Sequence, residues 1–409
     1  MNPTLGLLHP YPFQRLAALT ENLAPPALTR INMAIGEPRH PTPDLVKAEL
    51  TGALDALSTY PSTRGTEALR AAIAGWLTRR FRLPAHTLDP ERHVLPTSGS
   101  REALYSVVQA RVDRRADRPV VIMPNPFYQI YEGAALLAGA EPYYVNTDHA
   151  GGAVMNVEAI PRAILERTEV VITCSPGNPT GQVMRQDEYG RLLELAHRYG
   201  FLIVADECYS EIYFDEETPP EGLLAAAIAY GVRDFAHCVA VHSLSKRSNV
   251  PGLRFGFVAG DAGFMSALFT LRTYFGSAPS QLAQRAAIAA LGDETHVRDN
   301  RRLYREKFAD VIAILDDVLP VTRPDGGFYL WARTPIDDEA FVAGLYTAQN
   351  LLALPGSYLS RRSGGKDPGA GHIRLALVGP RAECKEGAYR LRSYVESLTR
   401  NQNDTSSAH

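Results

Sequence analysis

One lysine stands between two serines and close to two arginines in the stretch "HSLSKRSNVPGLRFGFVAG", residues 242–260. Lys246 follows an apolar run, and Arg254 lies beyond a Pro-Gly pair further along the chain. Positive charges at Arg247 and Arg254 favour the neutral amine and so lower the pKa of the lysine. A neutral amine attacks carbonyl carbons. The stretch therefore predicts a lysine that reacts with an aldehyde, beside cations that hold a phosphate.

Chemically useful side chains also follow three other apolar runs, which look like strands buried on both faces. These runs are residues 119–124, 170–175 and 201–207. They lead to an aromatic ring at Tyr128, an amide at Asn178, and a carboxylate and a phenol at Asp206 and Tyr209. Ligands of open α/β sheets bind beyond the carboxyl ends of the strands. We therefore expect these four side chains to meet Lys246 at one edge of a sheet.

A fifth element, "HVLPTSGSREAL" at 93–104, places Gly99 and Ser100 just before a run that favours a helix. Free backbone N–H groups at a helix start bind phosphate, and a glycine allows the ligand a close approach. An ordinary Ser-Gly turn that caps a helix gives the same pattern. The element is therefore a candidate phosphate site only in combination with the others.

The elements that would position these residues alternate between strand and helix. Further apolar runs at 238–243 and 255–260 resemble strands, and 187–200 has the apolar stripe of a helix. Such alternation predicts an α/β fold, with a mostly parallel sheet covered by helices. After it comes a long amphipathic helix at 301–319 and two strand-like stretches, 326–333 and 371–379, which suggest a smaller α+β domain.

These patterns divide the chain into four parts. We expect an N-terminal segment (1–45) that packs with the small domain, a large domain (46–285), a small C-terminal domain (286–400) and a disordered polar tail (401–409). Both ends of the chain would then contribute to the small domain.

The composition excludes several classes of protein. The 409 residues carry a formal net charge of −3, which leaves no basic face for nucleic acid. No apolar run approaches the ~18 residues of a membrane helix, and the N-terminus lacks the pattern of a signal peptide, so a cytoplasmic protein is expected. The four cysteines lie far apart, which predicts neither a disulfide framework nor a metal site.

Eight motifs, taken in order, resemble the class I/II (fold type I) pyridoxal-phosphate-dependent aminotransferases. They cover nearly the whole chain: "IGEP" (35–38), "YPSTRGTEALR" (60–70), "SGSREAL" (98–104), "PNPFYQIY" (124–131), "SPGNPTG" (175–181), "ADECY" (205–209), "SLSKRSNVPGLRFG" (243–256) and "IRLAL" (373–377). The family fold has a large domain with a seven-stranded sheet and a smaller domain built from the two chain ends. The resemblance thus implies the cofactor pyridoxal 5′-phosphate.

The resemblance also implies a role for each residue of the edge. Lys246 would form the Schiff base and then move the substrate proton. Asp206 would pair with the pyridinium nitrogen, Tyr209 and Asn178 would bond the ring 3-oxygen, and Tyr128 would stack on the ring. Catalysis is thereby assigned to Lys246, Asp206 and Tyr209.

The same resemblance assigns residues to the phosphate of the cofactor and to the α-carboxylate of the substrate. The phosphate would be held by the backbone N–H groups of Ser100 and Arg101, with Ser243, Ser245 and Arg254. Tyr60 would reach the phosphate of the neighbouring subunit, which implies a homodimer with shared active sites. Arg374 would clamp the α-carboxylate of the substrate, with help from the backbone at Gly36 and from Asn178.

Several phrases are similar to the N-succinyl-L,L-diaminopimelate aminotransferases of lysine biosynthesis. The donor would be glutamate, and the acceptor N-succinyl-2-amino-6-oxopimelate, whose three carboxylates call for cations beyond Arg374. Arg39, Arg64 and Arg101 are the candidates. Two alternatives remain open: an aminotransferase for aspartate, aromatic or branched-chain acids, and a carbon–sulfur lyase that uses the same cofactor. A cofactor-sensing DNA-binding regulator is disfavoured, because the family motifs begin by residue 35 and leave no room for a helix-turn-helix domain.

Overall fold

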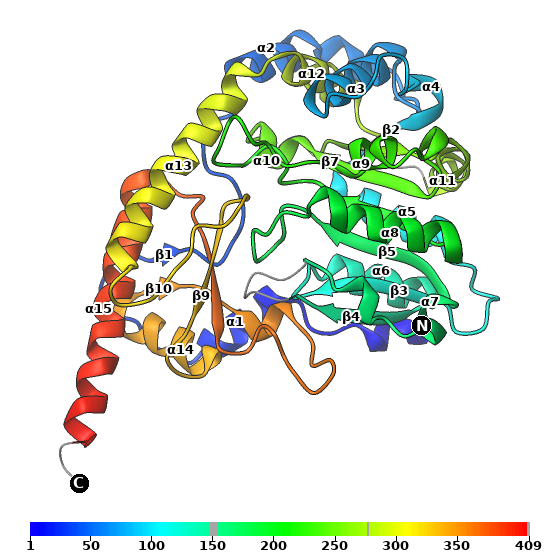
Figure 1. Cartoon of the computed structure of the whole chain (residues 1–409). Coiled ribbons are helices and arrows are strands. Elements are labelled where there is room, and N and C mark those ends of the chain that lie inside the picture. Colours follow the sequence, from blue (N-terminus) through cyan, green and yellow to red (C-terminus); the bar gives the residue numbers. More distant parts are fainter. Residues whose placement is uncertain (148–153, 276–277, 407–409) are drawn as a thin grey trace.

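The computed structural model describes residues 1–147, 154–275 and 278–406 (Figure 1). Its largest sheet has seven strands in the order β2-β8-β7-β6-β5-β3-β4. Their bounds are β2 Val94–Thr97, β3 Val120–Asn125, β4 Glu141–Asn146, β5 Thr168–Cys174, β6 Leu202–Asp206, β7 Cys238–Ser243 and β8 Gly256–Gly260. The pairs from β7 through β4 are parallel, and only β8 runs antiparallel to its neighbours. The prediction of a mostly parallel seven-stranded sheet is confirmed.

The inner strands are buried on both faces because helices cover both sides of the sheet. One face packs against α5 (Ser100–Arg111), α6 (Ile130–Ala138) and α11 (Ala262–Phe275). The other packs against α3 (Glu67–Arg80), α8 (Gln186–Tyr199), α9 (Leu223–Ala229) and α12 (Gln281–Gly292). The continuous apolar character of the runs that predicted these strands follows from this double cover.

A second core lies beside the sheet, at the left of Figure 1. It contains a three-stranded antiparallel sheet, β11-β12-β9, formed by β9 Tyr329–Arg333, β11 Leu354–Pro355 and β12 His372–Ala376. The helices α13 (Thr295–Leu315), α14 (Asp338–Gln349) and α15 (Arg381–Ser406) pack around it. This is the smaller α+β unit that the sequence predicts, although α13 begins and ends earlier than the expected 301–319.

The N-terminal segment divides its contacts between the two units. Strand β1 (Ile31–Asn32) pairs in parallel with β10 (Leu351–Leu352), and Leu16 of α1 (Pro12–Thr20) lies in the small core. The first short helix, η1 (Pro3–Leu7), instead lies against α6 of the large sheet. The second part of the segment thus contacts the small unit and its first part the large one, and the division of the chain into domains stays a prediction.

The C-terminus also differs from its prediction. Helix α15 continues to Ser406, so 401–406 are helical rather than a disordered tail, and 407–409 lie outside the described residues. The polar residues 401–406 predict a solvent-exposed tail, but a helix whose earlier turns are stabilised by packing can continue into solvent. Among the described helices, none is both long and apolar enough to cross a membrane.

Candidate active site

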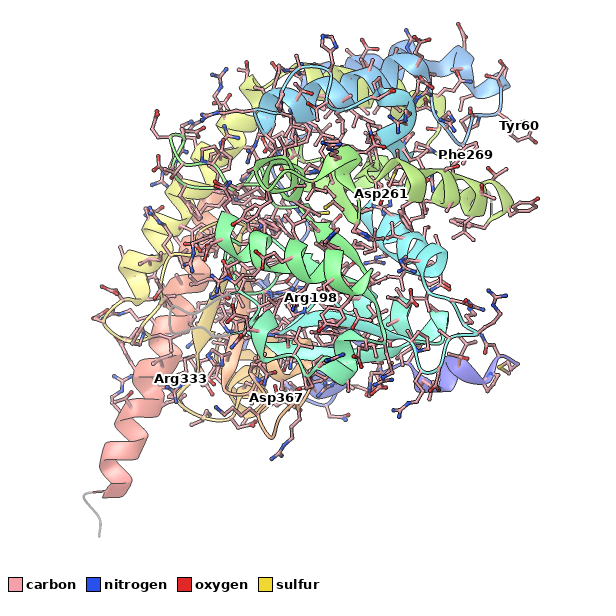
Figure 2. The ribbon with its side chains drawn as sticks, turned by 45° about the vertical axis from the view of Figure 1, so that its right-hand side comes forward. Tyr60, Arg198, Asp261, Phe269, Arg333 and Asp367 are labelled. Carbon is pink, nitrogen blue, oxygen red and sulfur yellow. The ribbon has the colours of Figure 1, made fainter. Side chains whose placement is uncertain are left out.

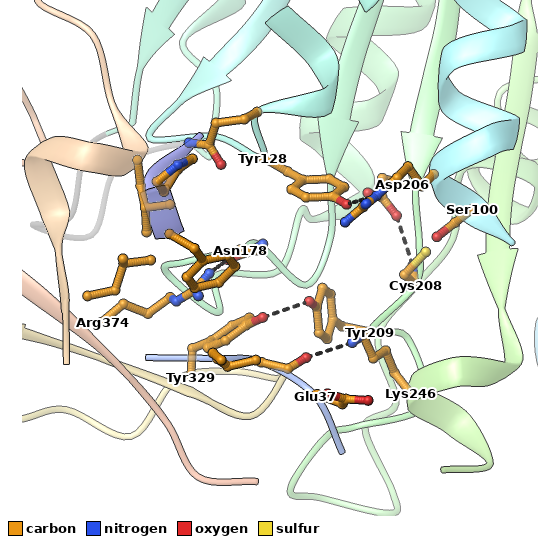
Figure 3. Close-up of a pocket in the computed structure, with 18 of the residues that line it drawn as sticks. Glu37, Ser100, Tyr128, Asn178, Asp206, Cys208, Tyr209, Lys246, Tyr329 and Arg374 are labelled. Atoms are coloured by element: carbon orange, nitrogen blue, oxygen red, sulfur yellow. Dashed lines mark hydrogen bonds between the residues drawn. The ribbon is translucent and has the colours of Figure 1, made fainter. Parts of the chain in front are cut away.

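A pocket lies at the carboxyl ends of the parallel strands, where they face the smaller unit (Figure 3). Nine residues predicted for the site line it: Gly36, Ser100, Arg101, Tyr128, Asn178, Asp206, Tyr209, Lys246 and Arg374. They come from both ends of the chain and from five strand ends between them, those of β2, β3, β5, β6 and β7. The structure thus brings together the side chains that sequence order keeps far apart.

Lys246 reaches the pocket from α10 (Leu244–Arg247), the single helical turn that follows β7. Its Nζ donates a hydrogen bond to the backbone oxygen of Gly36 at 2.7 Å. The pKa of the amine is lowered to about 8, mostly by burial, with smaller lowering effects from the nearby Arg374 and Arg254. A substantial neutral fraction is therefore present near neutral pH, as a nucleophilic amine requires.

The cause of this low pKa differs in part from the sequence prediction. Burial, not the crowding of like charges, has the largest effect. Arg247 points away from the pocket, because its guanidinium is buried against α12 and donates to the backbone oxygen of Ala290 at 2.7 Å and to Glu294. Its role is to anchor the turn that carries the lysine.

Asp206 ends β6 and is buried at the wall of the pocket. Its carboxylate accepts hydrogen bonds from the Tyr131 hydroxyl at 2.7 Å and from the Cys208 backbone N–H at 3.2 Å. Burial raises the pKa of the Asp206 carboxyl, and these two donors only partly offset that effect. A cation against this carboxylate would stabilise its charge.

An anion cradle lies at the start of α5, where Gly99 precedes Ser100 with φ +92°. A Cβ on Gly99 would approach Nη2 of Arg254 to 2.6 Å, so the guanidinium lies directly over this turn. The amides of the first helical turn have no partners within the helix and carry partial positive charge. The cradle and Arg254 together suit a phosphate.

Ser243 and Ser245 lie next to this cradle but do not line the pocket of the described chain. Ser243 caps α10 by accepting the backbone N–H of Ser245 at 3.1 Å. Gly256, which pairs with Ser243 across β7 and β8, lies against the Gly99–Ser100 main chain, where an added Cβ would come within 3.0 Å. Any phosphate role of these serines thus stays a prediction.

Tyr60 is fully exposed at the outer edge of the molecule (Figure 2) and does not line the pocket of its own chain. An exposed tyrosine there is available to a second chain. Its predicted role at the neighbouring subunit's phosphate is compatible with this position and remains a prediction.

Arg374 reaches the pocket from β12 of the small unit, opposite the strand ends. Its Nη1 donates to Oδ1 of Asn178 at 2.9 Å, and its Nη2 donates to the backbone oxygen of Ala34 at 2.8 Å. Its buried Nε has no partner among the described residues. The guanidinium is 4% exposed and has no carboxylate partner among the described ion pairs, so an incoming carboxylate would neutralise a buried charge.

Two phenols link the large and small units at the pocket. The Tyr209 hydroxyl lies 3.1 Å from the Tyr329 hydroxyl, and the Arg374 guanidinium stands over the Tyr329 ring at 4.3 Å. Across the pocket, Nε of Arg101 donates to the Tyr128 hydroxyl at 2.9 Å. These contacts fix the orientation of both tyrosines predicted to contact the cofactor.

Sequence reasoning missed several lining residues: Tyr11, Pro12, Phe13, Ile35, Glu37, Gln129, Cys208, Tyr329, Leu354 and Leu359. Ile35, Glu37, Gln129 and Cys208 sit inside motifs already noted, so adjacency could have indicated them. Tyr11 and Phe13 belong to the N-terminal helix, which carries no local signal of a site.

Of the three arginines predicted for distal carboxylates, only Arg101 lines this pocket. Arg39 pairs with Glu383 at the surface. Arg64 donates to the Glu91 backbone oxygen at 2.8 Å and stands over the Phe269 ring. Within the described chain, Arg101 is thus the one of these three arginines that lies where it could contact a substrate in this pocket.

The described residues fit pyridoxal phosphate. A partly neutral amine, a buried carboxylate without a cation and an anion cradle match the aldehyde, the ring nitrogen and the phosphate of that molecule. Arg374 completes the set with a buried cation for a substrate carboxylate.

Comparison with known proteins agrees with this fit. The family model described as aminotransferase class I and II matches residues 29–391. The LL-diaminopimelate aminotransferase of Desulforudis audaxviator is 34% identical, with 96% of this chain and 97% of that protein covered.

Solved structures are similar over the whole chain. An aminotransferase from Neisseria meningitidis is 45% identical with a TM-score of 0.92, covering 96% of this chain and 99% of its own. A probable N-succinyldiaminopimelate aminotransferase from Thermus thermophilus is 25% identical with a TM-score of 0.82, covering 94% and 100%. The chain therefore belongs to the class I and II aminotransferases, a family of enzymes that depend on pyridoxal phosphate.

Proposed function

We propose that this enzyme moves an amino group between glutamate and N-succinyl-2-amino-6-oxopimelate, as a succinyldiaminopimelate transaminase. The observation that carries the proposal is the convergence of Lys246, Asp206 and Arg374 on one pocket. An amine, a carboxylate and a cation that binds carboxylates, together in one cavity, suit the transfer of an amino group between an amino acid and an oxo acid. The reaction would run in two halves, with glutamate leaving as 2-oxoglutarate before the acceptor binds.

Lys246 is the base of the mechanism. When bound, pyridoxal phosphate supplies an electron sink that stabilises negative charge at Cα of the substrate. The Nζ of Lys246 would move the proton between Cα of the substrate and C4′ of the cofactor. A pKa of about 8 suits this task, because the amine both accepts and releases a proton near neutral pH.

Asp206 and Arg374 orient the reacting partners. The Asp206 carboxylate holds the ring nitrogen of the cofactor, which keeps that nitrogen protonated. Arg374 binds the carboxylate next to the reacting carbon, and its unpartnered Nε adds a donor to those at Nη1 and Nη2. Holding the cofactor at one end and the substrate carboxylate at the other would orient the reacting carbon relative to Lys246.

The remaining pocket residues hold the ring and exclude water. Tyr209 and Asn178 would donate hydrogen bonds to the ring 3-oxygen, and Tyr128 would cover the ring face. The Tyr209–Tyr329 and Asn178–Arg374 contacts already orient two of these three side chains. Pre-set donors avoid reorganisation during the reaction.

Arg101 is the residue that we assign to the acceptor's distal carboxylate. It is exposed beside the pocket, and its Nε bond to Tyr128 leaves its terminal nitrogens without a described partner. An acceptor with three carboxylates needs a cation in addition to Arg374. Apolar walls at Phe13, Leu354 and Leu359 would contact the methylene chain between the two carboxylate sites.

A second candidate is LL-diaminopimelate aminotransferase activity, which the names of the curated relatives favour. The relative from Aquifex aeolicus carries that name and is 29% identical over 95% of this chain and 97% of its own. The two substrates differ at the distal amine, which is acylated in one and a free ammonium in the other. Discrimination between the two substrates therefore depends on the residues at the mouth of the pocket, where the distal amine would lie.

The test compares kcat/KM for glutamate with the succinylated acceptor, for LL-diaminopimelate with 2-oxoglutarate, and for aspartate, aromatic and branched-chain oxo acids. We expect the succinylated acceptor to be preferred, and Arg101→Ala to lower its kcat/KM by about tenfold through KM. Arg64→Ala serves as the control and should leave it unchanged. A preference for unacylated LL-diaminopimelate would replace the proposal with the second candidate.

A further inference from the structure

The backbone of the Lys246 turn is held by a buried amide from the smaller unit. Asn300, on α13, is 2% exposed, and its Nδ2 donates to the backbone oxygens of Lys246 at 3.2 Å and Arg247 at 3.4 Å. A one-turn helix leaves its last carbonyls without partners inside the helix. Asn300 therefore supplies the donors that the end of α10 lacks.

The other end of the same amide meets His40. The His40 Nδ1 lies 2.6 Å from Oδ1 of Asn300, and the His40 Nε2 lies 2.6 Å from Nζ of Lys307. Lys307 is also buried, at 2% exposed, and donates to the backbone oxygen of Leu377 at 3.1 Å. None of its described contacts is an ion pair with a carboxylate.

The charge on Lys307 determines the direction of the two bonds that His40 makes: burial lowers the pKa of Lys307 to about 8, so near pH 7 its amine is mostly an ammonium. An ammonium is only a donor, so the His40 Nε2 accepts and its Nδ1 carries the hydrogen. Burial, with a smaller effect from Lys307, lowers the pKa of His40 to about 4, which keeps the imidazole neutral. The Nδ1–H then donates to Asn300 Oδ1, which also accepts from Nδ2 of Asn249 at 3.1 Å, and Nδ2 of Asn300 faces the Lys246 carbonyl.

These bonds close a ring around the reactive lysine. The Lys246 Nζ donates to the backbone oxygen of Gly36, and four residues later His40 donates to Asn300, which in turn donates to the Lys246 backbone oxygen. The lysine is therefore held at both its side-chain nitrogen and its main chain. Removing the His40–Asn300 bond would open the ring while leaving the residues that contact the lysine in place.

We propose that His40 and Asn300 are positioning residues, which hold the Gly36 carbonyl against the Lys246 amine and so fix the direction of its nitrogen in the pocket. Lys307 supports them by imposing the tautomer of His40. The inference rests on the proposed role of Lys246, but its test needs no turnover. It assigns a function to the buried Asn300 and the half-buried His40, neither of which lines the pocket.

The test uses two replacements of His40 that separate its two nitrogens. His40→Asn keeps an amide near the position of Nδ1 and can still donate to Asn300. His40→Gln places its amide near Nε2, so it keeps a partner for Lys307 and loses the bond to Asn300. The pKa of Lys246 is measured in the cofactor-free protein from the pH dependence of its acetylation, by mass spectrometry of the peptide that contains it.

In His40→Gln we expect the pKa of Lys246 to fall below its native value by about half a unit to one unit. The loosened Gly36 carbonyl no longer stabilises the ammonium, while burial still opposes it. Glu37, Cys208, Arg254 and Arg374, the charged or titratable groups that act on the amine, are unchanged in both variants. His40→Asn should keep the native pKa.

Asn300→Ala is the second variant, and it should lower the pKa of Lys246 as His40→Gln does. Equal shifts in His40→Asn and His40→Gln, or no shift in His40→Gln and Asn300→Ala, would overturn the inference. Because acetylation is measured without cofactor or substrate, a wrong substrate assignment leaves this result intact. A cofactor that fails to attach to Lys246 would contradict the proposed function instead.

Discussion

At the residue scale, the buried amine of Lys246 combines reactivity with a cost in stability. Its pKa of about 8 lies below the usual 10.5, so at pH values below 8 folding must confine an ammonium that water would solvate better. The cost fades as the pH rises from 8 toward 10.5, where the amine is neutral in both states. Reactivity and instability therefore share one cause, which is burial.

Lys246→Met is expected to raise the free energy of unfolding of the cofactor-free protein at pH 7 by roughly 1–3 kcal/mol. The gain should shrink between pH 8 and about 10.5, because the native amine no longer carries a charge there. Chemical denaturation at a series of pH values measures it. Lys366→Met, at an exposed lysine, is the control. A gain of equal size at pH 7 and pH 10 would contradict the buried-charge interpretation.

The polar half of the pocket could be predicted at this scale because its residues lie in short motifs. Lys246, Asp206 and Asn178 each follow an apolar strand directly, so the sheet rule places them together. Tyr11, Phe13, Leu354 and Leu359 could not be predicted, since apolar residues are common and only tertiary packing brings these four to the pocket. The role of His40 was hidden for the same reason.

At the element scale, the start of α5 is a turn that only glycine adopts without strain. Gly99 has φ +92° and ψ 160°, a region that other residues avoid, and Arg254 lies within 2.6 Å of the position of its missing Cβ. The turn directs the first amides of α5 and the Arg254 guanidinium to one point. A side chain here would separate them.

Gly99→Ala is expected to weaken binding of pyridoxal phosphate by about tenfold or more, because strain and displacement of Arg254 disturb the cradle. Gly252→Ala is the matched control, since its added Cβ meets nothing within 4 Å. Fluorescence titration of the cofactor-free variants with pyridoxal phosphate measures both affinities. Equal affinity in the two variants would show that the phosphate binds elsewhere.

Five strands of the large sheet were predictable because double cover gives uninterrupted apolar runs. The edge strand β4 was missed, since five of its six residues are only half-buried and its sequence "EPYYVN" does not form such a run. The predicted start of helix α13, at residue 301, lies six residues after the observed one. These six residues, "THVRDN", are mostly polar and contain only the beginning of the apolar stripe of the helix. Burial on one side only therefore weakens the apolar pattern in the sequence, both at β4 and at the start of α13.

At the scale of the whole molecule, the exposed Tyr60 makes the predicted homodimer testable. Lys246→Ala removes the base of its own site, and Tyr60→Glu would place a carboxylate against the neighbour's phosphate. In a mixed dimer, one site would combine the native Lys246 of one chain with the native Tyr60 of the other. Activity should therefore return when two inactive proteins exchange subunits.

An equal mixture after subunit exchange should regain about a quarter of the native activity, since half the dimers are mixed and each has one intact site. Native mass spectrometry separates the mixed dimer from the two parent dimers of 44.8 kDa chains and so establishes that exchange has occurred. A mixture that stays inactive after exchange would contradict a site shared between chains.

The most direct measurement of the central claim mixes the cofactor-loaded protein with glutamate alone and follows the visible spectrum. The account predicts that the aldehyde form of the cofactor gives way to its amine form, with one 2-oxoglutarate released per site. N-succinyl-2-amino-6-oxopimelate should then restore the first spectrum, and Lys246→Ala should do neither. A spectrum that ignores glutamate, with pyruvate and ammonia formed from cystathionine, would identify a lyase and contradict the account.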